Sequence, residues 1–346
     1  MKRLNFIDTL FNNEGHYIDD IINYKYLLKD YELHYFVNGD ISHENKKRLE
    51  GFNLHESSTN DKSTFGEIKY LVSIKKQLGA NDFNFIMSCK YISLFLFSVF
   101  NRFYNYYLLV HFFPTVKVNL YKVILSDLLK NSNGFMVLDI FVKNDILNKF
   151  RISKNNKIFI IHSRDIKNNQ VTLNCNNKIK LSFIGSMNQY KDILLLTNLI
   201  KKNYYKNIEF GFYSKGILPY LQNIETTNIL NIQDQYFSEA EFNRFLCESD
   251  FIFLSYTINY GLRFSGMLCD ALSNDCQLIC NDNASFKYYI EKYNCGYMFR
   301  DEDELHKILT NLQKLSINEE IYDDYSEETR EQLFLNIVEN FYGDKR

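Results

Sequence analysis

The chain has 346 residues, with 40 Lys and Arg side chains against 42 Asp and Glu, so its formal net charge is -2 at pH 7. This length exceeds what a single hydrophobic core usually holds and indicates two domains, for which the 46% of hydrophobic residues supply the cores. The balanced charge gives no general attraction to nucleic acid, and seven scattered cysteines indicate reduced thiols rather than a disulfide framework.

Neither the start of the chain nor its most apolar region has the pattern of a targeting or membrane-spanning segment. MKRLNFIDTLFNNEGH begins with basic residues, but its apolar patch is too short for a signal peptide. Residues 83–113 are interrupted by Lys90 and Arg102, whereas a span needs about 20 apolar residues. Aromatic and basic residues within this region fit either an interfacial helix or a buried core helix. We therefore expect a cytoplasmic protein, with peripheral contact to the inner membrane left open.

Strands and helices are expected to alternate through the first half of the chain. The expected strands are residues 3–7, 31–37, 83–88, 106–113, 134–140 and 157–163, and the expected helices are 15–30, 43–51, 65–79 and 118–132. Such alternation predicts a parallel sheet with helices on both faces.

A polar stretch at 164–178 interrupts this pattern and reads as a connector, after which the alternation resumes. The expected strands are now 180–186, 207–214, 227–232, 250–256, 277–282 and 296–299, and the expected helices are 191–204, 238–249, one starting at 265, 301–315 and 326–343. The sequence thus predicts an α/β protein with two doubly wound, Rossmann-like halves. We place an N-terminal domain at 1–165, a linker at 166–178, a second domain at 179–320 and a C-terminal helical segment at 321–346.

The stretch RFSGMLCD combines a cation, a Ser-Gly pair and an acid at the expected start of a helix. Ligands of parallel sheets bind beyond the carboxyl ends of the strands, where helix amides attract anions. Ser265 can cap the helix, Gly266 allows a phosphate to approach, and Arg263 adds positive charge. Asp270, one turn further on, is within reach of sugar hydroxyls. The alternative is that Ser265 merely caps a core helix and Arg263 is a solvated charge.

Four segments, taken in order, resemble the donor-binding domain of GT-B fold glycosyltransferases, in particular the retaining family 4 type and bacterial capsule and lipopolysaccharide enzymes. They are KLSFIGSMNQYKDI, NIEFGFYS, SEAEFNRFLCESDFIFLSY and RFSGMLCDALSNDCQLICND. The resemblance covers the second half of the chain well and the first half in outline. It implies two Rossmann-like domains that face one another across a cleft, with the C-terminal helix packing back on the N-terminal domain.

The resemblance also implies roles for residues of the second half. Gly185 and Ser186 would lie against the donor phosphates, Lys191 would pair with the diphosphate, and Asp270 would bind the ribose. The amides of Ser265 and Gly266 would hold the same diphosphate. The sequence departs from the family at Ser186, where many members have arginine, and at Leu262, where the first acid of a Glu-x7-Glu pattern would stand; Arg263 is a candidate for the missing positive charge.

Two histidines of the first half follow expected strands. Gly15 and His16 in NNEGHY resemble the flexible loop of GT-B enzymes near donor and acceptor. His111 in LLVHFFP resembles the active-site histidine that contacts the transferred sugar. A structural role is the alternative for both histidines.

No metal or cofactor is expected beyond the donor substrate. Helix amides, Lys191 and Arg263 would offset the charge of a departing nucleoside diphosphate. The Asp-x-Asp match at Asp301 and Asp303 reads as the acidic first turn of a helix rather than a metal site.

These observations predict an enzyme that transfers a sugar from a nucleoside-diphosphate sugar to a glycan or lipid-linked acceptor of a bacterial surface polysaccharide, such as O-antigen, capsule or lipooligosaccharide. Its partners would be the nucleotide sugar and the acceptor oligosaccharide, without nucleic acid. Two alternatives remain open: a non-catalytic GT-B relative that binds nucleotide sugar or glycan, and a nucleotide-sugar 2-epimerase. The epimerase is disfavoured because no cluster of carboxylates stands at the candidate site.

Overall fold

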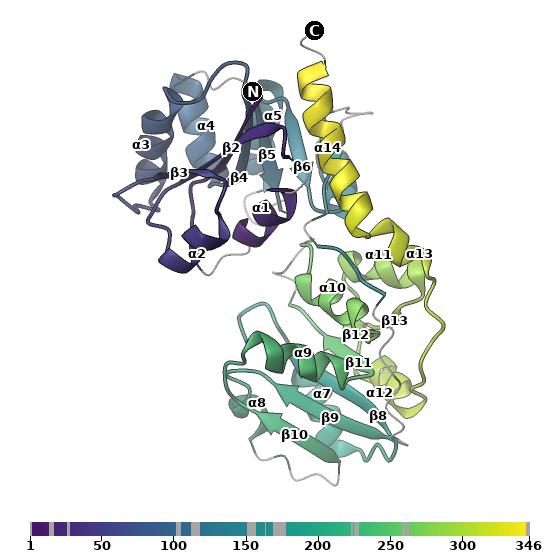
Figure 1. Cartoon of the computed structure of the whole chain (residues 1–346). Helices are drawn as coiled ribbons and strands as arrows, with labels where there is room; N and C mark the ends of the chain where they lie inside the picture. The colour runs from purple at the N-terminus through teal and green to yellow at the C-terminus, as the bar shows by residue number, and fades with distance from the viewer. Residues whose placement is uncertain are drawn as a thin grey trace. The chain divides into compact units, whose positions relative to one another are not determined.

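The chain folds into two compact units, which are described separately (Figure 1). The computed structural model describes residues 2–13, 17–25, 28–101, 105–111, 118–150, 157–162, 164–168, 178–222, 224, 228–257, 260 and 263–343. The first unit comprises Met1–Ser163 with Glu328–Arg346, and the second comprises Arg164–Glu327. The expected linker at 166–178 therefore starts inside the second unit, and only the last part of the segment at 321–346 joins the first.

The first unit is built on a seven-stranded parallel sheet with the order β3-β2-β1-β4-β5-β6-β7. Its strands are β1 (Lys2–Asp8), β2 (Tyr31–Val37), β3 (Asn53–Glu56), β4 (Phe83–Ser88), β5 (Tyr106–Val110), β6 (Gly134–Val137) and β7 (Ile158–Ile160). Its helices are α1 (Tyr17–Lys25), α2 (His43–Arg48), α3 (Thr64–Lys75), α4 (Tyr91–Phe100), α5 (Val118–Asn131), α6 (Ile140–Phe150) and α14 (Glu327–Gly343).

The expectation of a single strand over 134–140 was wrong at its carboxyl end, because Asp139 starts a helix there. Its side-chain oxygen accepts a hydrogen bond from the Ile140 amide at 2.6 Å, and its carbonyl accepts one from Lys143 at 3.1 Å. The chain therefore leaves the sheet after Val137 and continues as α6, which the apolar run alone did not predict.

The C-terminal helix α14 packs on the sheet of the first unit (Figure 1). Phe334 is fully buried, stacks on Tyr24 of α1 at a centroid distance of 4.0 Å and lies 6.3 Å from the ring of Phe6 in β1. Near the end of the helix, the Tyr342 hydroxyl donates to the carbonyl of Arg3 at 2.5 Å. The expected return of this helix to the N-terminal half is confirmed.

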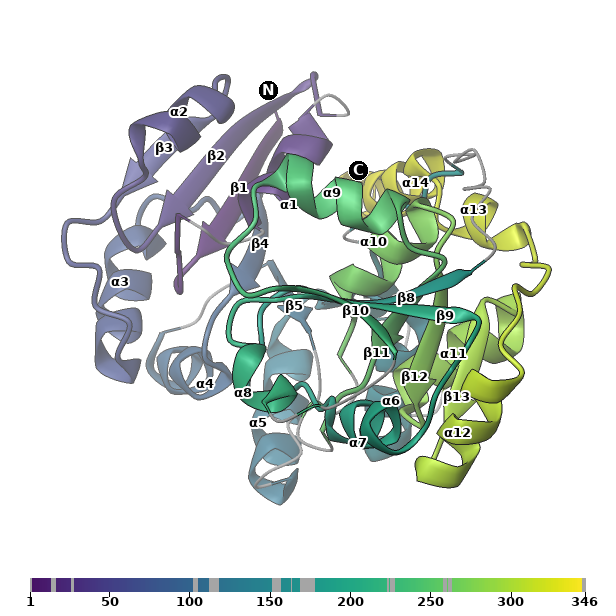
Figure 2. The same ribbon diagram turned by 90° about the horizontal axis from the view of Figure 1, so that it is seen from below.

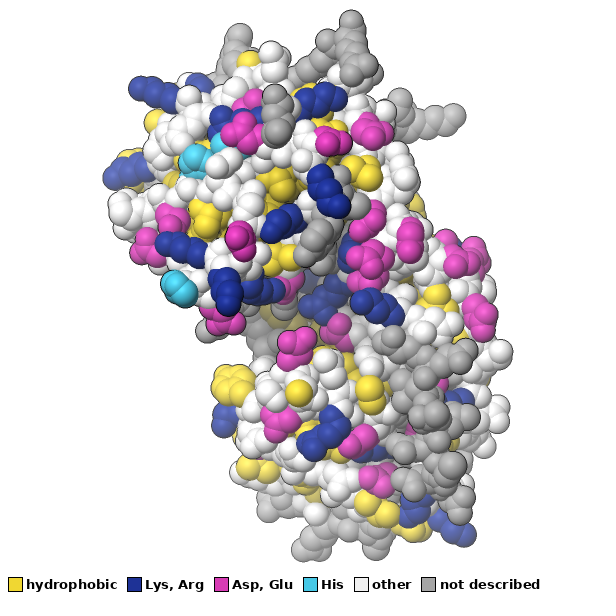
Figure 3. Space-filling view, viewed as in Figure 1, with side chains coloured by type: hydrophobic (Ala, Val, Ile, Leu, Met, Phe, Trp, Pro, Cys, Tyr) yellow, Lys and Arg dark blue, Asp and Glu magenta, His cyan; other side chains and the backbone are white. Residues whose placement is uncertain are grey.

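Helix α4, the most apolar helix, places part of its surface in the core of the first unit. Leu94 and Phe97 are fully buried, whereas Val99 is 58% exposed and Phe100 82% exposed. Among the described residues, no helix is both long and apolar enough to cross a bilayer. On the face seen in Figure 3, acidic and basic side chains are interspersed over both units, in keeping with the small net charge.

The second unit contains a six-stranded parallel sheet with the order β10-β9-β8-β11-β12-β13. Its strands are β8 (Ile179–Ile184), β9 (Ile208–Tyr213), β10 (Ile229–Gln233), β11 (Phe251–Leu254), β12 (Gln277–Asn281) and β13 (Gly296–Phe299). Its helices are α7 (Leu194–Lys202), α8 (Leu218–Leu221), α9 (Glu239–Cys247), α10 (Gly266–Ser273), α11 (Ala284–Tyr293), α12 (Glu302–Thr310) and α13 (Glu320–Asp324).

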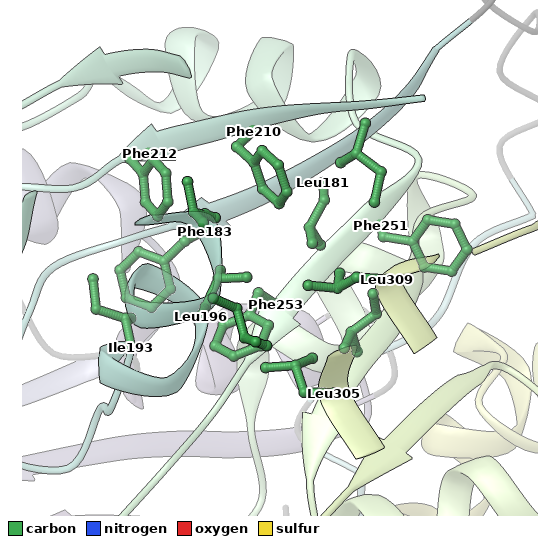
Figure 4. Close-up of a cluster of buried hydrophobic side chains, with 14 of the residues drawn as sticks. Leu181, Phe183, Ile193, Leu196, Phe210, Phe212, Phe251, Phe253, Leu305 and Leu309 are labelled. Carbon is green, nitrogen blue, oxygen red and sulfur yellow. The ribbon is translucent and has the colours of Figure 1, made fainter. Parts of the chain in front are cut away.

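Helices cover both faces of this second sheet. In Figure 2, α9 and α10 lie on one side of the strands, and α7, α8 and α12 lie on the other. Figure 4 shows Leu196 of α7 and Leu305 and Leu309 of α12 in one cluster with Phe183, Phe253 and other side chains of the strands. Each side chain of this kind contributes about 1.5–3 kcal/mol when fully buried. This core holds the strand ends, and hence the loops that follow them, in fixed positions.

Candidate functional site

The topological switch point of the second sheet lies between β8 and β11. From these adjacent strands the chain winds outward in opposite directions, toward β9 and β10 on one side and β12 and β13 on the other. In such sheets the loops that follow the two strands separate at their carboxyl ends and leave room for a ligand. The loops that begin at Gly185 and Ser255 are therefore the first place to look for a site.

These two loops are joined by backbone hydrogen bonds. Lys191 and Tyr256 form an isolated antiparallel bridge. On either side of it, the Thr257 amide donates to the carbonyl of Tyr190 at 2.7 Å, and the Asp192 amide donates to that of Ser255 at 3.0 Å. These bonds hold the loop after β8 and the loop after β11 at a fixed distance from each other.

Gly185 occupies a backbone conformation that favours glycine. Its φ is +98°, in the left-handed region, and a β-carbon placed there would lie 3.0 Å from the Nζ atom of Lys191. The next residue, Ser186, is exposed. The glycine therefore permits Lys191 to lie close against the backbone at the end of β8.

The ammonium group of Lys191 is partly withdrawn from water. Its Nζ atom donates to the carbonyl of Ile184 at 3.2 Å and lies 4.9 Å from the centre of the Phe183 ring. Burial disfavours the charged form and lowers the pKa of Lys191 to about 8. An anion at this position would compensate the desolvated charge, as expected of a phosphate ligand.

Arg263 is held against aromatic rings. Its guanidinium carbon lies 4.6 Å from the ring centre of Tyr190 and 5.8 Å from that of Tyr260. A hydrogen bond from Arg263 lowers the pKa of the Tyr190 hydroxyl. Tyr260 in turn stacks on Tyr256 at 4.0 Å. The guanidinium group is thus held against aromatic rings and is not fully solvated, while its role toward a ligand stays a prediction.

Ser265 and Gly266 stand at the start of α10, as the sequence predicts, but the expectation that the Ser265 side chain caps this helix was wrong. The Ser265 hydroxyl makes no capping hydrogen bond and lies 3.4 Å from the hydroxyl of Tyr256. The side chain is turned toward the buried tyrosine, away from the first-turn amides. Of the first-turn amides, that of Leu268 donates to the Ser265 carbonyl at 3.1 Å. The first amides of a helix otherwise find no acceptors within the helix itself.

Asp270, the predicted ribose-binding acid, forms an ion pair with Arg164. The Nη1 atom of Arg164 lies 2.6 Å from the Oδ1 atom of Asp270 in the second turn of α10. Arg164 belongs to the polar stretch that the sequence suggested was only a connector. No local pattern singles it out, because the two partners are 106 positions apart.

The predicted residues of the first half are described only in part. His111 follows β5 directly and is half-buried. Gly15 and His16 lie outside the described residues, as does Leu262. Their assigned roles stay predictions.

A buried polar cluster that the sequence did not reveal lies at the carboxyl ends of β1 and β4. The fully buried Glu67 accepts hydrogen bonds from Thr9 and Ser93, both at 2.7 Å. Nearby, Asp8 accepts from the Ser88 hydroxyl and, at 3.1 Å, from the Leu10 amide. Burial raises the pKa of Asp8 to about 6. The cluster fixes the point where the chain leaves β1.

The Asp-x-Asp match belongs to a helix start. Asp301 caps α12, and its Oδ1 atom accepts from the Glu304 amide at 2.9 Å. Within the described part of the chain, no three His, Cys, Asp or Glu residues are placed to hold a metal ion together.

Comparison with solved structures identifies the fold. HepE of Anabaena, solved with UDP, has a TM-score of 0.71 and 10% identity, covering 98% of this chain and 100% of its own. The lipopolysaccharide outer core galactosyltransferase WaaB has a TM-score of 0.67 at 12% identity, over 97% of this chain and 99% of its own. A glycosyltransferase of Rickettsia africae gives 0.67 at 14% identity, over 99% of both chains. The chain therefore has the GT-B fold, as the sequence predicts.

Sequence comparison adds little to this result. No protein-family model matches the chain. A match to the DNA-directed RNA polymerase subunit beta of Theileria parva is 25% identical over 205 residues, which are 57% of this chain. The chain spans 19% of the length of that subunit.

Proposed function

We propose that the protein is a glycosyltransferase that takes its sugar from a nucleoside-diphosphate sugar bound to the second unit. The observation that carries this proposal is the pairing of Gly185 with Lys191 at the switch point, next to the start of α10. The glycine lets a ligand approach the backbone closely, and the partly desolvated ammonium group attracts negative charge. Together they suit a diphosphate. The solved relatives of this fold that hold UDP support the same assignment.

The proposed reaction breaks the bond between the anomeric carbon of the sugar and the oxygen of the diphosphate. An acceptor hydroxyl forms the new bond to that carbon and gives its proton to the departing diphosphate or to water, and the nucleoside diphosphate leaves with the electron pair. Lys191, Arg263 and the first amides of α10 stabilise the negative charge that develops on the leaving group. Ser186 would add a hydroxyl to this contact.

The acceptor side is assigned to the first unit. In this proposal His111, at the end of β5, contacts the transferred sugar. Gly15 and His16 keep the role near donor and acceptor that the sequence suggests, as a prediction. The acceptor class is a glycan or a lipid-linked oligosaccharide of a bacterial surface polysaccharide, made on the cytoplasmic face of the membrane. The likeness to the lipopolysaccharide galactosyltransferase WaaB supports this class.

A thermal-shift screen with UDP, GDP, CDP and dTDP, in the presence of EDTA, tests the donor site. A ligand at 100 times its Kd stabilises the folded state by about 2.7 kcal/mol, so one of the four should raise the Tm clearly. Lys191→Ala should abolish the shift, while Lys201→Ala, which removes an exposed charge of α7, should keep it.

The sugar conjugates of the nucleotide that binds then test turnover. Release of nucleoside diphosphate from one of them, faster than in the His111→Ala variant, is the expected result. Binding without any turnover, with acceptor extracts present, would favour the non-catalytic alternative. Interconversion of the sugar at C2 without transfer would favour the epimerase. A lack of any Tm shift would reject the donor site.

A further inference from the structure

Both glycines of the donor site have a cation where their side chain would be. A β-carbon on Gly185 would lie 3.0 Å from Nζ of Lys191. A β-carbon on Gly266 would lie 3.1 Å from the guanidinium carbon of Arg164, 3.3 Å from its Nε atom and 3.4 Å from Nη1. The same geometric relationship therefore recurs at the end of β8 and at the start of α10.

These two glycine and cation pairs are linked through the side chain of Met267. The Cε atom of Met267, the residue after Gly266, lies 3.5 Å from the position of a β-carbon on Gly185. The side chain of Met267, in the first turn of α10, thus reaches the loop that follows β8.

The segment that carries Arg164 is attached to the second unit by its own backbone. The Lys167 amide donates to the Ser273 hydroxyl, at the end of α10, at 3.0 Å. The Ile166 amide donates to the carbonyl of Tyr325 at 2.9 Å, and the Ile166 side chain is 2% exposed. Arg164 is therefore presented to α10 by a fixed piece of chain.

Electrostatics favours an anion between Arg164 and the helix. A cation at a helix N-terminus is opposed by the helix dipole, and this unfavourable interaction is relieved when a negative group binds both. The ion pair with Asp270 relieves it in part, but the side chains of Arg164 and Asp270 are 35% and 27% exposed, so water screens the pair. A guanidinium group suits two oxygens of a phosphate at once.

We propose that Arg164 binds the diphosphate of the donor and that Asp270 is a positioning residue, which orients Arg164. This inference rests on the proposed function, since it concerns the same donor site. It adds Arg164, a residue outside the sequence motifs, to those that contact the diphosphate. It also makes Arg164, rather than the ribose of the donor, the partner of Asp270.

The test compares a nucleoside diphosphate with its own nucleoside, using whichever of UDP, GDP, CDP and dTDP binds the wild-type protein. Arg164→Ala should raise the Kd of the diphosphate about 10- to 100-fold, the effect of losing one charge-assisted hydrogen bond. The Kd of the nucleoside, measured by competition, should stay unchanged. Arg164→Lys should give a Kd for the diphosphate between those of the wild type and Arg164→Ala. Lys167→Ala, an exposed cation three positions further on, is the matched control and should bind as the wild type.

Two further variants separate positioning from ribose binding and from misfolding. Asp270→Asn should weaken binding of the diphosphate and leave binding of the nucleoside unchanged. An equal loss of affinity for both ligands would show that Asp270 binds the ribose and would overturn its positioning role. Gly266→Ala keeps Arg164 and Asp270 but crowds the guanidinium group, so it should weaken diphosphate binding less than Arg164→Ala does, with an unchanged Tm. If Arg164→Ala folds and binds the diphosphate as the wild type does, the inference about Arg164 is overturned, while the proposed function stands. Failure of all four diphosphates to bind the wild type would overturn the proposed function with it.

Discussion

The ring of Tyr24 in α1 stacks on that of Phe334 in α14, with 4.0 Å between centroids and 17° between planes. Two helices from opposite ends of the chain thus share one contact in the core of the first unit. Phe334→Ala should lower the free energy of unfolding by about 3–5 kcal/mol, because it removes a buried ring and leaves a cavity. Urea unfolding followed by circular dichroism measures this loss. Phe100→Ala, at an 82% exposed position, should change stability little, and equal effects of the two variants would contradict the role of α14.

Affinity for the nucleoside diphosphate should depend on pH through Lys191. The pKa of this group is about 8 in the free protein, and a bound anion raises it because it favours the charged form. Affinity is therefore fully present below pH 8 and is lost as the pH rises through 8. We expect Kd to increase about tenfold between pH 7 and pH 9, measured by calorimetry. Lys191→Arg stays charged throughout and should give a flat profile. An identical slope in this variant would assign the titration to another group.

Asp8 should make the protein less stable at neutral than at mildly acidic pH. Its folded-state pKa of about 6 lies above the ordinary value of 3.8, so the folded state binds the proton more tightly than the unfolded state does. This contribution lowers stability as the pH rises from about 4 to above 6, by an amount on the order of 3 kcal/mol. Asp8→Asn removes the titration while keeping a similar shape. The difference in unfolding free energy between wild type and variant should change over this range, and an equal difference at pH 4 and pH 7 would contradict this role of Asp8.

Gly185→Ala should damage binding more than stability. The φ of +98° costs an L-residue about 1–2 kcal/mol, and the added methyl group meets Nζ of Lys191 at 3.0 Å. The variant should lose a few degrees of Tm and most of its affinity for the diphosphate. Gly343→Ala is the control, since its methyl group would meet nothing within 4 Å. If Gly185→Ala binds the diphosphate normally, then binding does not require Lys191 Nζ to lie against residue 185.

The sequence predicts those parts of the structure that have local causes. Buried strands such as Tyr31–Val37 and Phe83–Ser88 are found at their predicted bounds, because an apolar run is a local property. The strand Asn53–Glu56 was missed, since a short edge strand with polar residues carries no such run.

The residues of the candidate site also divide into those that a local motif predicts and those that only the fold brings together. Gly185 and Lys191 are six positions apart and belong to one motif, so sequence reasoning could place them together. Arg164 approaches Asp270 only because the segment at 164–168 returns along α10, and nothing near either residue in the sequence records that approach. The turn of the Ser265 hydroxyl toward Tyr256 likewise depends on a bridge between two loops.

The position of α14 in the chain determines which of the two units is complete first during synthesis. A domain made first by the ribosome usually folds first. Here the core of the first unit lacks Phe334 until residues 164–327 have all been made, because they precede α14 in the chain. The second unit, encoded in the middle, is the first to possess all of its own residues. The unit at the amino terminus is the last to be finished.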